Sequence, residues 1–95
     1  MTMLDNTSTH RPVHEIAAEI YATWRNREGG VNVWYGAKPY LEAMCDLNKI
    51  TDPYMADRGT DIVIYFLSNA TTWKGDDARR IKAELRAMLK DVSKR

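Results

Sequence analysis

The stretch "DIVIYFLSNA", residues 61–70, decides the fold because helix and strand compete there more closely than anywhere else in the chain. It contains a run of residue types that are enriched in strands: Ile62, Val63, Ile64, Tyr65 and Phe66. A strand needs a partner for its backbone groups, whereas the rest of the chain has helical periodicity. We therefore predict a helix, apolar on nearly every side, at the buried centre of a helical bundle.

Working outward from this segment, the sequence predicts an all-α fold arranged as a compact bundle of four helices. The first helix has an apolar stripe at the spacing of one helix face, made by Val13, Ile16, Ala17, Ile20 and Trp24. The same spacing recurs in the second and last helices. The predicted helices cover about residues 10–27, 36–48, 60–70 and 75–92.

Prolines, hydroxyl groups and carboxylates mark where these helices begin. Pro12 suits a first helical turn and Thr9 can cap it, so the first helix is expected to begin between Thr9 and Val13. Proline is tolerated only in the first turn of a helix, so Pro39 requires the second helix to begin shortly before it, near residue 36 or 37. Asp76 and Asp77 are expected in the first turn of the last helix, where carboxylates favour the helix dipole.

The segment between the second and third helices is predicted to contain a short helical turn near residues 53–57. Asp52 and Pro53 would open this turn, Gly59 would end it, and Thr60 would cap the following helix. Residues 1–8 are polar and aperiodic, which predicts a flexible tail. Residues 9–95 are then expected to form a single helical domain.

Composition narrows the classes of function. The chain has 95 residues, 44% of them hydrophobic, and a formal net charge of +1, so no global field attracts a polyanion. Its single cysteine, Cys45, excludes an intrachain disulfide, and packing within the core is the expected role for it. The N-terminal residues lack the pattern of a signal peptide, and no apolar run is long enough to span a membrane. A cytoplasmic location is therefore expected.

Residues for enzyme chemistry are sparse. His10 and His14 lie four residues apart, but a metal site needs three or four converging ligands, so no metal is predicted. The chain also lacks a glycine-rich phosphate-binding motif, so no cofactor is predicted. The tripeptide at residues 75–77, "GDD", is interpreted as a helix start. No catalytic residue is expected, and the chain is not expected to be an enzyme.

Three aromatic residues in predicted connections are candidates for partner binding: Trp34, Tyr35 and Trp73. Small domains need large rings to complete their cores, which favours a role as plugs at the ends of the bundle. The alternative is that these rings stand at the surface as anchors for another protein.

The last predicted helix has a basic stripe formed by Arg79, Lys82, Arg86 and Lys90. Its simplest interpretation is a solvated polar face, with contact to an acidic protein or to nucleic acid as alternatives. Arg80 is expected to pair with Glu84 one turn away, which partly neutralises this region.

The apolar seam of the same helix, with Ile81, Leu85 and Met88, is expected to pack against the bundle or against a second copy of the chain. In the second case the protein would be a homodimer.

Two segments, "YGAKPYLEAM" at 35–44 and "IVIYFLSNATTWKGDDARRIKAEL" at 62–85, resemble small uncharacterised proteins encoded by actinobacterial phages and prophages. Lys74 stands where that family pattern has arginine, and Met55 where it has glycine. The resemblance implies a phage-encoded, cytoplasmic, helical accessory protein that binds a host or phage protein. The alternative function is nucleic-acid binding through Arg79, Lys82, Arg86 and Lys90.

Overall fold

The computed structural model describes residues 10–25, 29–30 and 32–93, and these residues form four α-helices and two short β-strands. The elements in chain order are α1 (Val13–Thr23), α2 (Lys38–Met44), β1 (Pro53–Tyr54), β2 (Asp57–Arg58), α3 (Gly59–Ser68) and α4 (Asp76–Ser93). The mostly helical, compact fold predicted from the sequence is confirmed. The predicted tail at residues 1–8 and the cap at Thr9 lie outside the described residues.

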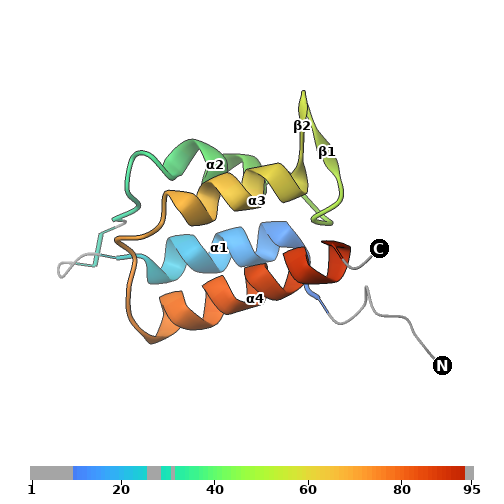
Figure 1. Ribbon diagram of the computed structural model, residues 1–95. Coiled ribbons are helices and arrows are strands. Elements are labelled where there is room, and N and C mark those ends of the chain that lie inside the picture. Colours follow the sequence, from blue (N-terminus) through green and yellow to red (C-terminus); the bar gives the residue numbers. More distant parts are fainter. Residues whose placement is uncertain (1–9, 26–28, 31, 94–95) are drawn as a thin grey trace.

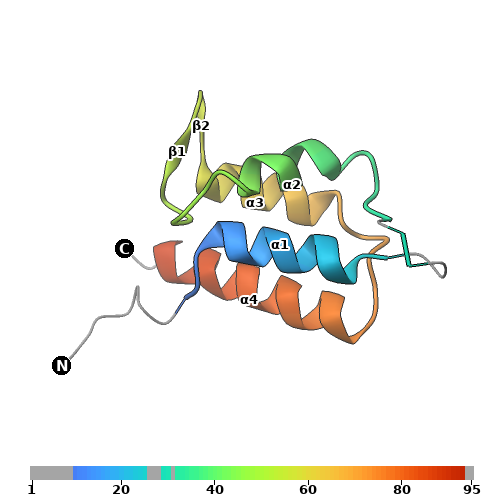
Figure 2. The same cartoon turned by 180° about the vertical axis from the view of Figure 1, so that it is seen from behind.

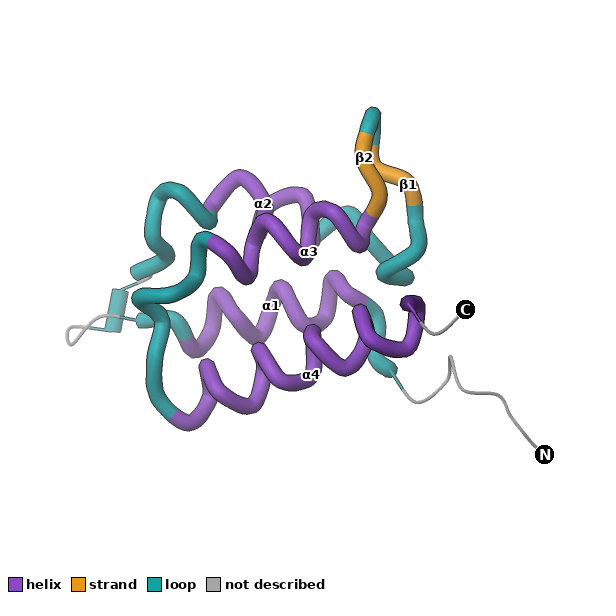
Figure 3. Tube along the Cα trace, viewed as in Figure 1, coloured by secondary structure: helices purple, strands orange, loops and turns teal. Residues whose placement is uncertain are grey.

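The helices lie side by side and alternate in direction along the chain (Figures 1 and 2). α1 packs against α2 and α4, and α3 packs against the same two helices. The β1–β2 hairpin projects beyond the helices at the end where α3 begins (Figure 3). The chain therefore places its first and last helices next to each other.

The core is apolar throughout, because every fully buried residue among those described is hydrophobic or glycine. Trp24, at the end of α1, stacks on Trp73 from the α3–α4 connection, with ring centroids 5.1 Å apart and planes 11° apart. The edge of Trp24 also meets Phe66 of α3 at 6.3 Å. These three rings close the core at one end.

α1 begins and ends inside its predicted bounds. It starts at Val13 rather than near residue 10, and the amides of Val13 and His14 donate to the carbonyl oxygens of Asn48 and Leu47, both at 2.9 Å. These carbonyl groups take over the role of a side-chain cap, and Pro12 at the N-cap makes no side-chain bond. The predicted end at residue 27 is wrong, because helix stops at Thr23, where Trp24 turns into the core.

The apolar stretch at residues 61–70, where helix and strand competed, forms most of α3 and is helical, as predicted, as far as Ser68. However, α3 is not buried on every side. Its buried face contains Ile62, Val63 and Phe66, whereas Ile64 is 46% exposed and Tyr65 is 44% exposed. A helix that packs against two neighbours covers one face, so the remaining apolar side chains reach the surface. The prediction that this helix forms the buried centre of the bundle is therefore wrong.

The predicted helical turn at residues 53–57 is wrong as well, since this segment is a hairpin that pairs Pro53 with Arg58 and Tyr54 with Asp57. The carboxylate of Asp52 accepts the amides of Asn48 and Lys49, at 3.1 and 2.9 Å, so it caps the preceding turn and not a following one. Met55 takes a φ of 54° in the loop, a conformation that glycine adopts more easily.

Gly59 has a different role from the predicted one. It is the first residue of α3 and does not end a turn; a Cβ at this position would lie 2.4 Å from the carbonyl oxygen of Ile50. Its amide donates to the carbonyl oxygen of Asp52 at 2.7 Å. Thr60 lies within the helix and is not its cap, because the Asp61 carboxylate accepts the Arg58 amide at 3.3 Å instead.

Candidate functional site

The structure separates the three predicted aromatic anchors. Tyr35 is 75% exposed and Trp34 is 43% exposed, so the favoured prediction that these two rings plug the end of the bundle is wrong, and they lie at the surface as the alternative expected. Trp73 is 4% exposed and stacks on Trp24, so it completes the core and does not reach a partner. The prediction that Trp73 forms part of a binding surface is therefore wrong, and its role as a plug is confirmed.

Four rings form what we call the aromatic surface: Trp34, Tyr35, Tyr40 and Tyr65. Trp34 and Tyr35 lie 4.2 Å apart between ring centroids, and Tyr40 of α2 lies 5.3 Å from Tyr65 of α3. A Cβ at Gly36 would lie 2.5 Å from the Trp34 ring nitrogen and 3.2 Å from Asn69 Oδ1. Asn69 is one helical turn from Tyr65 and donates to its carbonyl oxygen, so Gly36 lies beside the end of α3.

Tyr65 was missed as a surface residue, although the helical spacing contains a signal for it. Once residues 61–70 are helical, Ile62, Val63 and Phe66 define the inward face, and Tyr65 falls outside it. Because the whole segment is rich in β-favouring apolar residues, its composition does not distinguish the buried face of the helix from the exposed one.

The basic stripe is divided by its contacts. Arg79 is exposed and pairs with Asp76 at 2.9 Å, whereas the Lys82 ammonium donates to the Trp73 carbonyl oxygen at 2.6 Å and lies 5.9 Å from the Trp73 ring. Burial, followed by the nearby charges of Arg86 and Lys74, lowers the pKa of Lys82. Arg86 and Lys90 lie further along α4 and are exposed.

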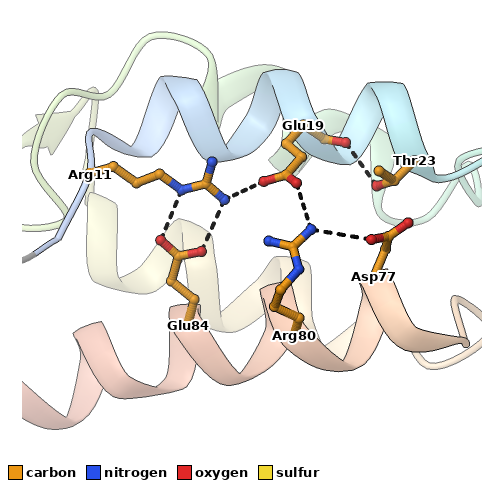
Figure 4. Close-up of polar contacts among 6 residues, drawn as sticks. All are labelled: Arg11, Glu19, Thr23, Asp77, Arg80 and Glu84. Carbon is orange, nitrogen blue, oxygen red and sulfur yellow. Dashed lines mark hydrogen bonds and ion pairs between the residues drawn. The ribbon is translucent and has the colours of Figure 1, made fainter.

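Two acidic residues of α4, Asp77 and Glu84, lie on the side of the helix that faces α1 (Figure 4). Arg11 donates to both oxygens of Glu84, at 2.9 and 3.0 Å, and also to Glu19. The Arg80 guanidinium donates both to the Glu19 carboxylate, at 2.6 Å, and to the Asp77 carboxylate, at 3.2 Å. The predicted Arg80–Glu84 pair is therefore wrong, because Arg11 binds Glu84 with both donors of its planar fork.

The segment that precedes α1 has a further contact near the end of α4, between His10 and Asp91. Together, the polar contacts that residues 10–19 make with α4 form what we call the α1–α4 ladder. The α1–α4 ladder includes three carboxylates of α4 that are spaced seven residues apart: Asp77, Glu84 and Asp91.

Glu19 makes the stability of this ladder depend on pH. Its hydrogen bonds, with Arg80 first and Arg11 next, lower the pKa of the carboxyl below its ordinary value of 4.5. Because the folded pKa lies below the unfolded one, ionised Glu19 stabilises the fold above pH 4.5, and this contribution is lost as the pH falls through the folded pKa.

We expect Glu19→Gln to lower the free energy of unfolding at neutral pH by about 1 kcal/mol or less, since the side chain is partly solvated. The deficit should shrink as the pH falls below 4.5, as measured by urea unfolding at a series of pH values. In an Arg80→Met background the deficit should already be smaller at neutral pH. A deficit that stays constant down to acid pH would contradict this account.

A shallow groove lies between α3 and α4. Its lining residues are Thr60 and Ile64 from α3, and Arg86, Leu89, Lys90 and Val92 from α4. Ile64, Leu89 and Val92 make it apolar, while Arg86 and Lys90 add positive charge. We call this feature the α3–α4 groove.

The seam predicted for dimerisation faces inward. Ile81 and Leu85 are completely buried and Met88 is 3% exposed, because all three pack in the core of the chain itself. Of the two packing partners expected for this seam, the structure has the bundle itself, and these side chains are not at the surface.

The remaining reactive residues do not cluster. Cys45 is exposed and not part of the core, contrary to the prediction; its Sγ donates weakly to the Leu41 carbonyl oxygen at 3.5 Å. Partial burial, followed by the charges of Asp46 and Glu42, raises the pKa of this thiol. Within residues 10–25, 29–30 and 32–93, no three His, Cys, Asp or Glu side chains come together as a metal site.

None of the helices in the described part of the chain has both the length and the apolar character needed to cross a membrane. Comparison with protein-family models, with curated proteins and with solved structures gives no match to this chain.

Proposed function

We propose that this chain is a small, non-enzymatic accessory protein that binds a host or phage protein. In this proposal it is phage-encoded and acts in the host cytoplasm, and residues 9–95 form a single compact four-helix bundle that serves as a rigid scaffold. The aromatic surface, with Trp34 and Tyr35 beside Tyr40 and Tyr65, makes the contact.

The exposure of these rings is the observation that supports the proposal. Tyr35 is 75% exposed, and Trp34 and Tyr65 are each more than 40% exposed, on adjoining parts of the α2–α3 side. Keeping such rings in water forgoes the stabilisation that their burial supplies, so folding alone does not account for them. Tryptophan and tyrosine are also the side chains that most often dominate the binding energy of protein interfaces.

Nucleic-acid binding through the basic stripe has less support. Arg79 already pairs with Asp76, and Lys82 is committed to the Trp73 carbonyl oxygen. A phosphate-tracking surface gains affinity from each cation that it can offer, so the contacts of Arg79 and Lys82 reduce the number of cations that this stripe offers.

The proposal is tested by affinity capture from a nuclease-treated lysate of the cells that express the gene. The wild-type chain is expected to retain a discrete protein at near-equimolar yield. Tyr35→Ala/Tyr65→Ala should weaken its retention by about thirtyfold, since loss of a hot-spot side chain costs about 2 kcal/mol.

The matched control is Met55→Ala, which also truncates an exposed apolar side chain, 91% exposed, but does so in the β1–β2 hairpin. This variant should retain the same protein as the wild type. Equal retention by all three proteins, or a capture that disappears after nuclease treatment, would rule the proposal out.

A further inference from the structure

Three basic residues lie close together on α4 and on the connection that precedes it: Lys74, Lys82 and Arg86. The Lys82 ammonium donates to the Trp73 carbonyl oxygen at 2.6 Å, and that carbonyl group belongs to the peptide bond that joins Trp73 to Lys74. The backbone of Lys74 therefore lies beside the Lys82 ammonium, and Arg86 follows Lys82 by one turn on the same face of α4. We call these three residues the cation cluster.

The cation cluster makes no ion pair with a carboxylate in the part of the chain that the structure describes. Two carboxylates of α4 bind other cations instead, since Asp76 pairs with Arg79 and Glu84 pairs with Arg11. Like charges one helical turn apart repel each other, so the cluster stores an electrostatic cost that an anion would relieve.

The electrostatics of Lys82 agree with this arrangement. Burial is the largest cause that lowers the pKa of its ammonium, and the charges of Arg86 and Lys74 lower it further, with no carboxylate acting in the opposite direction. Arg86 and Lys74 are therefore close enough for their charges to act on Lys82.

We infer that the cation cluster binds the phosphate group of a phosphate monoester. Such a group carries a charge of about −1.5 to −2 at neutral pH and three acceptor oxygens, which suits three neighbouring cations better than a single carboxylate does. The Arg86 guanidinium can donate to two of these oxygens at once, and Lys74 adds a point charge. The inference does not depend on the proposed function, because the aromatic surface takes no part in it.

Lys82 gives the cation cluster a fixed point. Its ammonium has three donors, and the bond to the Trp73 carbonyl oxygen uses one of them, which leaves two for a ligand. Trp73 is buried and stacks on Trp24, so the core of the protein holds this carbonyl group in place. Because the Lys82 side chain is already ordered, a phosphate group that binds it costs less conformational entropy than it would at a freely moving lysine.

The surroundings of the cation cluster favour a single phosphate group over a polyanion. A nucleic-acid strand gains affinity from cations that continue along a surface. In the first turns of α4, however, Arg79 is neutralised by Asp76, and Arg80 binds both Asp77 and Glu19. Further phosphates on this side of the cluster would meet carboxylates as well as cations.

The test titrates methyl phosphate into the isotopically labelled protein at neutral pH and constant ionic strength, and follows the titration by NMR. The backbone amides of Lys74 and Arg86 and the Arg86 Nε–H should shift saturably, with a Kd of about 1 mM or tighter. Methyl sulfate has a similar shape but a single negative charge, and it should bind at least about tenfold more weakly. Equal affinities for the two anions would overturn the inference.

Charge removal in the protein tests the cluster itself. Lys74→Gln/Arg86→Gln should weaken the binding of methyl phosphate by at least about tenfold. Both residues are exposed, so the spectrum of the folded protein should otherwise be kept. The matched control Lys38→Gln/Lys49→Gln removes the same charge at two exposed residues outside α4 and should bind like the wild type. Equal losses in the two variants, or no loss in either, would overturn the inference.

A short peptide with one phosphoserine identifies the source of the phosphate group. If it binds more tightly than methyl phosphate, the site accepts phosphate on a protein side chain; if it binds equally or more weakly, the site serves small phosphate esters. In both cases the unphosphorylated peptide should not bind, and binding by it would overturn the inference.

Two further measurements separate the cation cluster from other surfaces. Tyr35→Ala/Tyr65→Ala should leave the binding of methyl phosphate unchanged, so failure of this inference and failure of the proposed function can be told apart. A DNA duplex should bind no more tightly than methyl phosphate at equal phosphate concentration. Much tighter binding of the duplex that Lys74→Gln/Arg86→Gln abolishes would overturn the inference in favour of a polyanion surface.

Discussion

Trp73→Ala is expected to lower the free energy of unfolding by about 3 to 5 kcal/mol, the largest effect of any substitution considered. Trp73 is 4% exposed and stacks on Trp24, and its carbonyl oxygen accepts a hydrogen bond from the Lys82 ammonium. Its removal leaves a cavity beside Trp24 that the short α3–α4 connection cannot fill. Because a domain of this size is stable by only about 5 to 14 kcal/mol, the variant would be marginal.

Guanidinium unfolding followed by far-UV circular dichroism measures this loss. The matched control is Trp34→Ala, the same change at a residue that is 43% exposed, which should cost less than about 1 kcal/mol. Trp73→Phe should fall between the two, since it keeps a ring against Trp24. Similar losses for Trp73→Ala and Trp34→Ala would contradict the assignment of Trp73 to the core.

Gly59→Ala is expected to destabilise the fold by about 1 to 3 kcal/mol, because the new methyl group overlaps the backbone. A Cβ at this position lies 2.4 Å from the Ile50 carbonyl oxygen and 2.9 Å from its carbon. The Gly59 amide also holds Asp52 in place, so the chain cannot shift without losing that bond. Alanine normally stabilises a helix relative to glycine by about 0.5 to 1 kcal/mol, so the expected sign is opposite to the helix preference.

Gly36→Ala is the control for this substitution. A Cβ at Gly36 would lie 2.5 Å from the Trp34 ring nitrogen, but this indole is at the surface and can rotate away. The cost in urea unfolding should therefore be smaller than for Gly59→Ala, although the emission of Trp34 should change. A stabilising effect of Gly59→Ala would show that the approach of Ile50 is not a constraint.

Elements fixed by local chemistry could be predicted from the sequence, and those fixed by distant contacts could not. α4 begins at Asp76, within one residue of its predicted start, because Gly75, at a φ of 110°, and two carboxylates mark this boundary. The hairpin at 53–58 was missed because Asp52 caps the turn before it and Met55 occupies the position that usually signals a hairpin with glycine.

In the candidate site, too, the features fixed by distant contacts could not be predicted from the sequence. Trp34 and Trp73 both lie in connections of similar composition, yet one is exposed and the other is buried against Trp24, which is distant in sequence. The Arg80–Glu84 pair follows from helical spacing, but Arg11, 73 residues from Glu84, takes that carboxylate. Local spacing identifies which charges can pair within a helix and does not reveal a competitor from another helix.

The α1–α4 ladder also determines how the fold would respond to a mechanical load. α1 and α4 are antiparallel neighbours (Figure 1). His10, which precedes α1, meets Asp91 near the end of α4. A tether pulling on these two points loads the contacts in series, with His10–Asp91 first, Arg11–Glu84 next and Glu19–Arg80 last. The two helices would peel apart one ion pair at a time and would not shear as a unit.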